Sequence, residues 1–309
     1  MAYGEAILRM GLPKGRMQAE VLRLLADSGL PVKSDERGYR PRVGEGRSSA
    51  FEAKFLKPQN IVEMLDSGSR DIGFAGADWV AELRRAKLLR RAARGEGEAE
   101  FEVVELLDTG LDPVSIVAAA PQALLEAGEL PRGRALVVAS EYESLAGEWI
   151  ERRAPGSAFI RSYGATEAFP PEDADVIVDN CATGGTLRAN GLQVLDVLME
   201  SSTRLYASSR ALEDPAKREA AEALVLVLGA VLEARRRVMV EINVAADRLA
   251  ELSAALPCLR SPTISPLEGG NAFAVRIAAP RSGLAALIPE IRRRGGTDIV
   301  VTELAQLVP

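Results

Sequence analysis

The stretch DVIVDNCATGGTLRANGL, residues 175–192, begins as an apolar strand and continues into a loop of small residues that leads toward a helix. A strand followed by a loop and a helix is the repeating unit of α/β domains. The strand ends at Asp179, and the loop that follows contains the run Thr183 to Thr186. This stretch therefore predicts an α/β fold with a glycine-containing loop directly after a buried strand.

Loop 183–186 has the composition of a phosphate cradle. Glycines let backbone N–H groups approach an anion closely, threonine hydroxyls add donors, and a helix N-terminus favours negative charge. At the rim, Asp179 could accept hydrogen bonds from ribose hydroxyls, and we prefer it to Asp175, which lies nearer the strand start. Taken by itself, the loop is equally compatible with a plain strand-to-helix turn.

The N-terminal part shows the same alternation of strand and helix. An apolar run at 6–10 precedes a loop at 11–15, and a later helix beginning at Pro58 precedes the buried strand in DIGFAGAD, residues 71–78. This alternation predicts a largely parallel sheet, whose strand ends are where open α/β sheets bind ligands. The charged residues at those ends are Lys14, Arg16, Lys57 and Asp78. Each is also compatible with solvated surface charge, and Asp78 with the N-cap of a helix starting at Trp79.

The remaining pattern divides the chain into three parts. Strands are expected at 101–106, 113–120, 135–139 and 175–179, a helix at 192–199, and a strand at 202–208. A long helix from Pro215 to about Ala234 then leads to a strand, helix, strand, strand, helix, strand pattern over 238–302, which is typical of a ferredoxin-like module. The expected domains are lobe I (1–96 with about 189–222), lobe II (97–188) and a C-terminal domain (226–309).

Composition excludes several classes of function. The 309 residues carry a formal net charge of −6 and no histidine. The negative charge argues against nucleic-acid and anionic-membrane binding, and the missing histidine excludes Ser-His-Asp triads and His-ligated zinc. Two cysteines, Cys181 and Cys258, without signal peptide or apolar membrane segment, indicate a cytoplasmic protein.

Five motifs together carry a resemblance to a known family. They are LPKGRM (12–17), FLKPQNIV (55–62), DIGFAGADWV (71–80), DNCATGGTLRANGL (179–192) and LRSPTISPL (259–267). In this order and spacing the chain resembles the long form of ATP phosphoribosyltransferase nearly from end to end. The resemblance implies two lobes of periplasmic-binding-protein-like (type II) fold, followed by a ferredoxin-like regulatory domain.

The resemblance also implies a reaction and a site. ATP and phosphoribosyl pyrophosphate (PRPP) would give N1-phosphoribosyl-ATP and pyrophosphate, the first step of histidine biosynthesis, with Mg²⁺ carried by PRPP rather than by an assigned protein ligand. The PRPP loop would comprise Asp179, Thr183, Gly184, Gly185, Thr186 and Leu187. The ATP side would comprise Lys14, Arg16, Lys57 and Asp78, although many relatives have arginine at 57.

For the C-terminal domain the resemblance implies feedback inhibition by histidine in a homo-oligomer, expected to be a hexamer. Leu259, Ser261 and Thr263 fall in the matching segment, and Asn243 takes a place where some relatives carry aspartate. An amide is a weaker partner than a carboxylate for an ammonium group.

Two other readings of the function of the whole chain stay open: a two-lobed sensor that binds a small anion without catalysis, and a phosphoribosyltransferase for another base.

Overall fold

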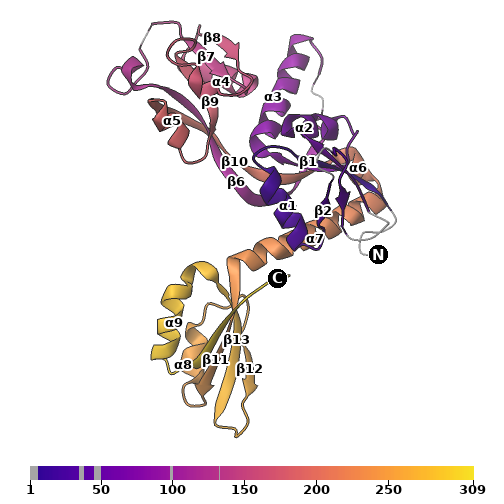
Figure 1. Ribbon diagram of the computed structural model, residues 1–309, viewed down its shortest axis with the longest axis vertical. Helices are drawn as coiled ribbons and strands as arrows, with labels where there is room; N and C mark the ends of the chain where they lie inside the picture. Colours follow the sequence, from indigo (N-terminus) through magenta and orange to yellow (C-terminus); the bar gives the residue numbers. More distant parts are fainter. Residues whose placement is uncertain (1–5, 35–37, 45–49, 98–99, 132) are drawn as a thin grey trace. The chain divides into compact units, whose positions relative to one another are not determined.

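The computed structural model describes the chain except residues 1–5, 35–37, 45–49, 98–99 and 132 (Figure 1). The expected crossing between lobes at 91–100 therefore lies partly outside the described residues. The chain divides into two compact units, one formed by 1–23 with 32–222 and the other by 24–31 with 223–309.

The first unit is built on an eight-stranded sheet with strand order β4-β1-β5-β10-β6-β9-β7-β8. Two groups of parallel strands stand at its ends: β1 (Leu8–Pro13), β4 (Phe51–Leu56) and β5 (Ile72–Gly76) form the first half, and β7 (Val137–Ser140), β8 (Ala158–Arg161) and β9 (Val176–Cys181) form the second half. The long strands β6 (Val103–Pro121) and β10 (Leu192–Ser208) pair antiparallel between them (Figure 1). The predicted α/β class is confirmed, with parallel strands inside each half.

Helices cover the two halves separately. α1 (Gln18–Asp27), α2 (Pro58–Asp66) and α3 (Ala77–Ala93) follow the strands of the first half, and α4 (Glu143–Arg153) and α5 (Gly185–Ala189) those of the second. In the first half Ile61 of α2 packs so closely on the sheet that a Cβ at Gly73 would lie 2.5 Å from it. In the second half Trp149 of α4 is buried against Val138 and Val176.

Three expectations about the elements of this unit are wrong. Residues 192–199 are the start of strand β10 and not a helix. The strands expected at 101–106 and 113–120 are one strand, β6, which begins at Val103, and α3 starts at Ala77 after the N-cap Gly76 and not at Trp79. Register shifts between Val194 and Asp196 and between Val197 and Met199 explain the first error. Each shift breaks the two-residue alternation of a strand, so that the apolar residues fall at spacings that imitate a helix.

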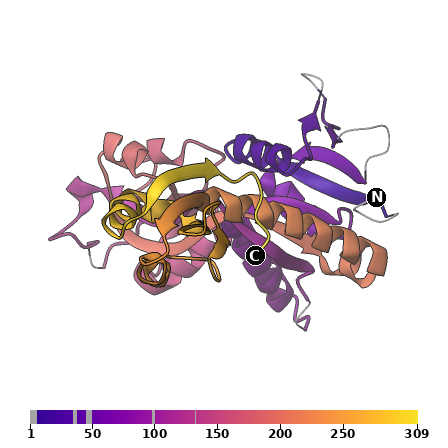
Figure 2. The same cartoon turned by 90° about the horizontal axis from the view of Figure 1, so that it is seen from below.

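The second unit contains the ferredoxin-like module. β11 (Arg237–Ala245), α8 (Leu249–Ala255), β12 (Thr263–Pro266), β13 (Ala272–Pro280), α9 (Leu284–Arg293) and β14 (Thr297–Glu303) form an antiparallel sheet of order β12-β13-β11-β14 with two helices. Both helices lie on one face of this sheet (Figures 1 and 2), where Leu252 and Ile291 pack against alternate residues of β11. The expected strand and helix order is confirmed.

Two further helices precede this module. α6 (Ser209–Glu213) is followed by the 22-residue helix α7 (Pro215–Arg236). The Asp214 carboxylate accepts a hydrogen bond from the N–H of Ala216 at 2.9 Å, so it caps α7 as the Asp-Pro pair predicts. Among the described residues, the structure contains no helix long and apolar enough to cross a membrane.

Candidate functional site

The glycine-containing loop forms a cavity of about 330 Å³ at the carboxyl end of β9. The cavity is lined by residues 179–187, by the turn 164–167 and by Glu141. All six residues predicted for the PRPP loop are therefore brought together, although Leu187 turns its side chain into the core and is only 5% exposed. The site can thus offer backbone groups at Gly184, Gly185 and Leu187, and side chains at Asp179, Thr183 and Thr186.

Glycine at 184 is required by the shape of the loop. Its φ of +70° lies in the left-handed region, and an added Cβ would lie 2.8 Å from a guanidinium nitrogen of Arg188. That guanidinium donates a hydrogen bond to the carbonyl of Thr183 at 3.0 Å and so closes the loop on itself. The turn leaves the start of α5 open to the cavity, as the phosphate-cradle interpretation expects.

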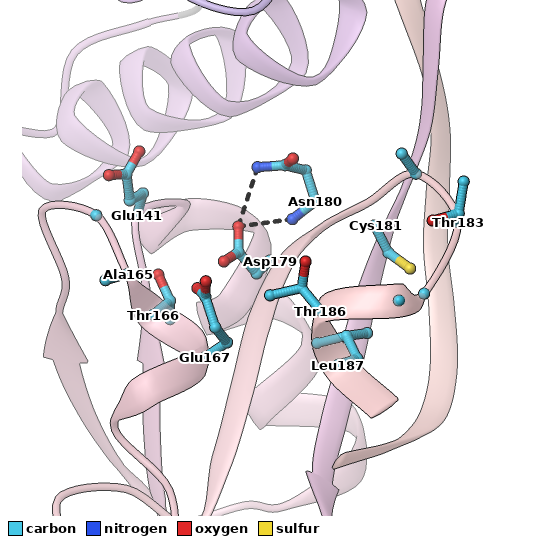
Figure 3. Close-up of a pocket in the computed structure, with 14 residues that line it drawn as sticks. Glu141, Ala165, Thr166, Glu167, Asp179, Asn180, Cys181, Thr183, Thr186 and Leu187 are labelled. Atoms are coloured by element: carbon cyan, nitrogen blue, oxygen red, sulfur yellow. Dashed lines mark hydrogen bonds between the residues drawn. The ribbon is translucent and has the colours of Figure 1, made fainter. Parts of the chain in front are cut away.

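Carboxylates share this cavity with the loop. Figure 3 shows Asp179 and Glu167 near each other, with Thr186 on the loop beside them and Glu141 on a neighbouring turn. Asp179 accepts hydrogen bonds from the backbone N–H (2.7 Å) and the side chain (3.0 Å) of Asn180. Burial raises the pKa of Asp179 from 3.8 to about 6, the Asn180 N–H opposes this, and the nearby Glu167 and Glu141 add to it.

The raised pKa of Asp179 predicts that Asp179→Asn stabilises the protein at neutral pH. The folded state holds the Asp179 proton more tightly than the unfolded state, so this group lowers the free energy of unfolding as the pH rises from about 4 to 6. Asparagine at 179 carries no charge, so the variant does not bear the cost of a buried ionised carboxylate at neutral pH. We expect the melting temperature of the variant to exceed that of the wild type at pH 8, with a smaller difference at pH 4.5. Equal melting curves at pH 8, or an equal gain from the exposed control Asp173→Asn, would contradict this.

The four residues expected on the ATP side lie elsewhere in the first half, and within the described chain none of them lines this cavity. Lys14 follows β1 with its ammonium 3.8 Å from the ring centre of Tyr39. Arg16 donates a hydrogen bond to the carbonyl of Asp112 at 3.2 Å. Lys57 is exposed at the N-cap of α2, whose first residue is Pro58.

Asp78 is 4% exposed and both of its carboxylate oxygens already have partners. One accepts a hydrogen bond from the Tyr142 hydroxyl at 2.7 Å and the other from the Ser201 hydroxyl at 2.7 Å. The helix that contains it is capped at Gly76, so the N-cap alternative for Asp78 is not realised.

Sequence reasoning missed Glu141, Thr166, Glu167 and Asn180, which also line the cavity. A signal for Glu141 was available, because it follows β7, and β7 is parallel to β9, so the two strand ends meet at one edge of the sheet. No comparable signal marks the turn 164–167, where Ala165 has a positive φ of 50° and Thr166 is buried against Ser162.

In the C-terminal module three of the four residues expected for histidine come together. Leu259, Ser261 and Thr263 line a surface hollow of about 290 Å³. Asn243 is not part of the lining found in the described chain, and it donates a hydrogen bond to the Asp298 carboxylate at 3.0 Å instead. Asp298 has a positive φ of 47°, a conformation that is uncommon outside glycine and strained for other residues.

The first unit is an α/β protein of two halves with a cavity of about 330 Å³ at the carboxyl end of β9, the kind of place where open α/β sheets bind small molecules. The comparisons with known proteins narrow this description to a family. The family model described as ATP phosphoribosyltransferase matches residues 57–229, and the model described as HisG, C-terminal domain, matches residues 234–306. The chain belongs to the ATP phosphoribosyltransferase family, and its two matched regions are those of the long form.

The sequences of similar proteins support this family membership. The ATP phosphoribosyltransferase of Chlorobium phaeobacteroides is 30% identical over 98% of both chains, and that of Pelotomaculum thermopropionicum is 30% identical over 98% of this chain and 99% of its own. The solved ATP phosphoribosyl transferase (HisG:HisZ) complex from Thermotoga maritima has a chain that matches with a TM-score of 0.57 and 21% identity, over 72% of this chain and 99% of that one. This last likeness concerns the fold alone.

Proposed function

We propose that the chain transfers the 5-phosphoribosyl group of PRPP to N1 of ATP, with release of pyrophosphate, in the first step of histidine biosynthesis. Family membership supports the reaction. The observation that carries the site is the cavity at the carboxyl end of β9, which places Asp179 next to a loop built around Gly184. A sensor without catalysis would not need such a loop beside carboxylates.

The proposed site works by position and charge. Backbone N–H groups near Gly185 and the hydroxyls of Thr183 and Thr186 hold the 5-phosphate, and Asp179 accepts hydrogen bonds from the ribose hydroxyls. Adenine N1 carries a lone pair and needs no base before it attacks C1 of the ribose, so the absence of histidine from the sequence is no obstacle. The protein orients both substrates for in-line displacement and stabilises the charges that develop.

Magnesium fits the donor set of this cavity. The carboxylates of Glu141, Glu167 and Asp179 would repel a bare diphosphate, and oxygen ligands are those that Mg²⁺ prefers. We propose that substrate phosphates supply most of the ligands, because Mg²⁺ is usually bound through only one or two protein carboxylates together with phosphates. The carboxylates of Glu141 and Asp179 would hold Mg²⁺, which would supply positive charge to offset the negative charge of the leaving pyrophosphate.

For ATP we propose Lys14, Arg16 and Lys57 as phosphate-facing cations of the first half. Asp78, which the sequence also suggested for this side, is buried with both carboxylate oxygens already hydrogen-bonded, so we do not propose it as an ATP ligand. Three cations at strand and helix ends suit a triphosphate, because open α/β sheets bind ligands at these ends. Lysine at 57 retains the charge but lacks the two-pronged geometry of arginine, so its contact would be less directional.

The test of this function is mass-spectrometric detection of phosphoribosyl-ATP after the protein is mixed with ATP, PRPP and Mg²⁺. We expect product with ATP and none when adenine, guanine or other bases replace it. Product with another base would support the second reading from the sequence, and binding of PRPP without any product would support the sensor.

We further propose that histidine inhibits the enzyme at the C-terminal module, in a cytoplasmic homo-oligomer whose hexameric state light scattering would measure. The hollow lined by Leu259, Ser261 and Thr263 supports a small-ligand site. Asn243 and Asp298 do not line this hollow in the described chain. The Asn243 amide has a carboxylate partner in Asp298, which supplies the negative charge that an aspartate at 243 would have provided, and we propose that the ammonium group of histidine binds at this pair.

Asp298→Asn is therefore expected to raise the histidine concentration that halves activity by about tenfold, since a charged hydrogen bond is roughly twice as strong as a neutral one. The measurement is inhibition of each variant relative to its own uninhibited rate. Glu303→Gln removes an exposed carboxylate from the same strand, β14, and serves as the control. Equal sensitivity of wild type and Asp298→Asn would exclude Asp298 from histidine binding.

A further inference from the structure

The N-terminus of helix α4, in the second half of the first unit, is capped by a residue of helix α3, in the first half. Within the described chain, the N-cap residue Tyr142 makes no side-chain capping hydrogen bond. The Glu82 carboxylate on α3 takes that role: it accepts hydrogen bonds from the backbone N–H of Ser144 at 2.9 and 3.0 Å and of Leu145 at 2.9 Å. Glu82 is 4% exposed, so the contact lies out of water.

One helical turn earlier, Asp78 makes a second contact between the same two helices. Its carboxylate accepts the hydrogen bond of the Tyr142 hydroxyl at 2.7 Å, and the rings of Tyr142 and Trp79 lie 4.7 Å apart. Burial first, and then the charge of Asp78, raises the pKa of Tyr142, so its hydroxyl stays protonated and remains a donor. We call these contacts of Asp78 and Glu82 with residues 142–145 the α3–α4 latch.

The latch continues into the strand that carries the loop cavity. The Tyr142 N–H donates to the Ser140 hydroxyl at 2.9 Å, and this hydroxyl donates to the carbonyl of Val178 at 2.6 Å. Val178 directly precedes Asp179, and Glu141, between Ser140 and Tyr142, lines the cavity. A set of buried hydrogen bonds thus leads from Asp78 on α3 of the first half to Tyr142, Ser140 and Val178, which are sequence neighbours of the cavity residues Glu141 and Asp179.

We propose that Glu82 and Tyr142 are positioning residues for the transfer reaction, which hold the Ser140–Tyr142 turn and the start of the Asp179 loop in register with the first half. The proposal rests on the proposed function in that it takes the cavity as the PRPP site. Neither residue lies among those lining the cavity within the described chain, so their effect passes through Glu141 and Asp179.

If the only role of the latch were to hold α3 and α4 together, a buried carboxylate such as Glu82 would not be needed. A buried carboxylate is costly to desolvate unless its hydrogen bonds are well made, and apolar side chains could hold α3 and α4 together at lower cost. The same helices also share an exposed ion pair, in which Arg85 and Glu148 stand 3.8 Å apart with side chains 41% and 45% exposed. What the buried Glu82 contact adds is orientation, because two backbone N–H donors, through three hydrogen bonds, fix the carboxylate and the start of α4 relative to each other.

The test compares Glu82→Gln and Tyr142→Phe with Glu148→Gln, which makes the same charge change at the exposed pair. Hydrogen exchange is measured for the α4 start and for a peptide spanning 179–187, and kcat and KM for PRPP are determined well below each melting temperature. Glutamine keeps the shape of Glu82 but turns an NH₂ toward backbone donors. Tyr142→Phe removes one hydroxyl and leaves the ring beside Trp79.

We expect about tenfold faster exchange at the α4 start in Glu82→Gln, faster exchange in the loop peptide, and a fall in kcat/KM for PRPP of about tenfold. Tyr142→Phe should speed loop exchange and lower kcat/KM by a smaller factor, and Glu148→Gln should change neither by more than about twofold. If both latch variants lower the melting temperature while loop exchange and PRPP constants equal those of the wild type, the latch is structural only and the proposal fails. Loop exchange is read without turnover, so it separates failure of the latch from failure of the proposed function.

Discussion

Asp179→Ala is expected to lower kcat/KM for PRPP by about 100-fold or more, which makes it the most damaging single change to activity that the structure predicts. Asp179 is the carboxylate closest in sequence to the loop, and it lines the cavity together with Thr183 and Thr186. Loss of one preorganised charged group at a reacting centre typically costs about 3 to 4 kcal/mol of transition-state stabilisation. Thr186→Ala removes one neutral donor and should lower kcat/KM by about tenfold.

Steady-state kinetics with both substrates varied would check these values. Asp173→Ala is the matched control, because Asp173 is an exposed aspartate six residues earlier that does not line the cavity in the described chain. Unchanged turnover in both Asp179→Ala and Thr186→Ala would show that PRPP binds elsewhere. The expected loss of activity in Asp179→Ala, taken with the stabilisation expected of Asp179→Asn, would show that this carboxylate is retained for function at a cost in stability.

Asp71→Ala is expected to have the largest effect on stability. Asp71 is 1% exposed and ties together three elements of the first unit. Its carboxylate accepts hydrogen bonds from the Arg9 guanidinium at 2.7 and 3.0 Å, from the Arg9 backbone N–H at 2.8 Å, and from the Lys217 ammonium at 3.0 Å. Removal of one partner from a buried ion pair typically costs about 3 to 5 kcal/mol, and the partial exposure of Arg9 and Lys217 places the expected loss near the lower end.

The stabilisation that Asp71 contributes depends on pH, and the direction follows from its lowered pKa. Burial works to raise the pKa of Asp71, but the hydrogen bonds from Arg9 and Lys217 outweigh it and hold the pKa below 3.8. The stabilisation is therefore complete above about pH 4 and is lost as the pH falls through the lowered pKa. Denaturant unfolding at pH 7 and at pH 3 would measure it, with Glu129→Gln at an exposed ion pair as a control of little effect. If Asp71→Ala unfolds at pH 7 at the same denaturant concentration as the wild type, the stabilising role given to Asp71 is wrong.

Local features of the sequence were enough to predict the loop and the C-terminal module. The small-residue run after Asp179 forms the loop that its composition predicted, and β11 and the second half of β13 show the alternation of more and less buried residues that is typical of a half-buried strand. The Asp214 cap and Pro215 likewise act on the helix that follows them.

Features that depend on distant parts of the chain could not be predicted in this way. Residues 192–199 form a strand because β10 pairs with β6 some 70 to 100 residues away, and its bulges hide the strand period. The sequence around Asp78 does not indicate its hydrogen bond with Tyr142, 64 residues later. The sequence around Asn243 likewise does not indicate its hydrogen bond with Asp298. Glu167 was missed for the same reason, since it reaches the cavity from the separate turn 164–167, whereas Glu141 could have been found from its place at the end of β7.

The most direct test of the proposed site is a crystal structure of the protein with PRPP and Mg²⁺ bound. The predicted result is density for the 5-phosphate within the turn formed by residues 183–187, with a ribose hydroxyl within hydrogen-bond distance of the Asp179 carboxylate. PRPP bound outside this cavity, for example among the lysine and arginine residues of the first half, would contradict the central claim that the loop after β9 holds the phosphoribosyl group.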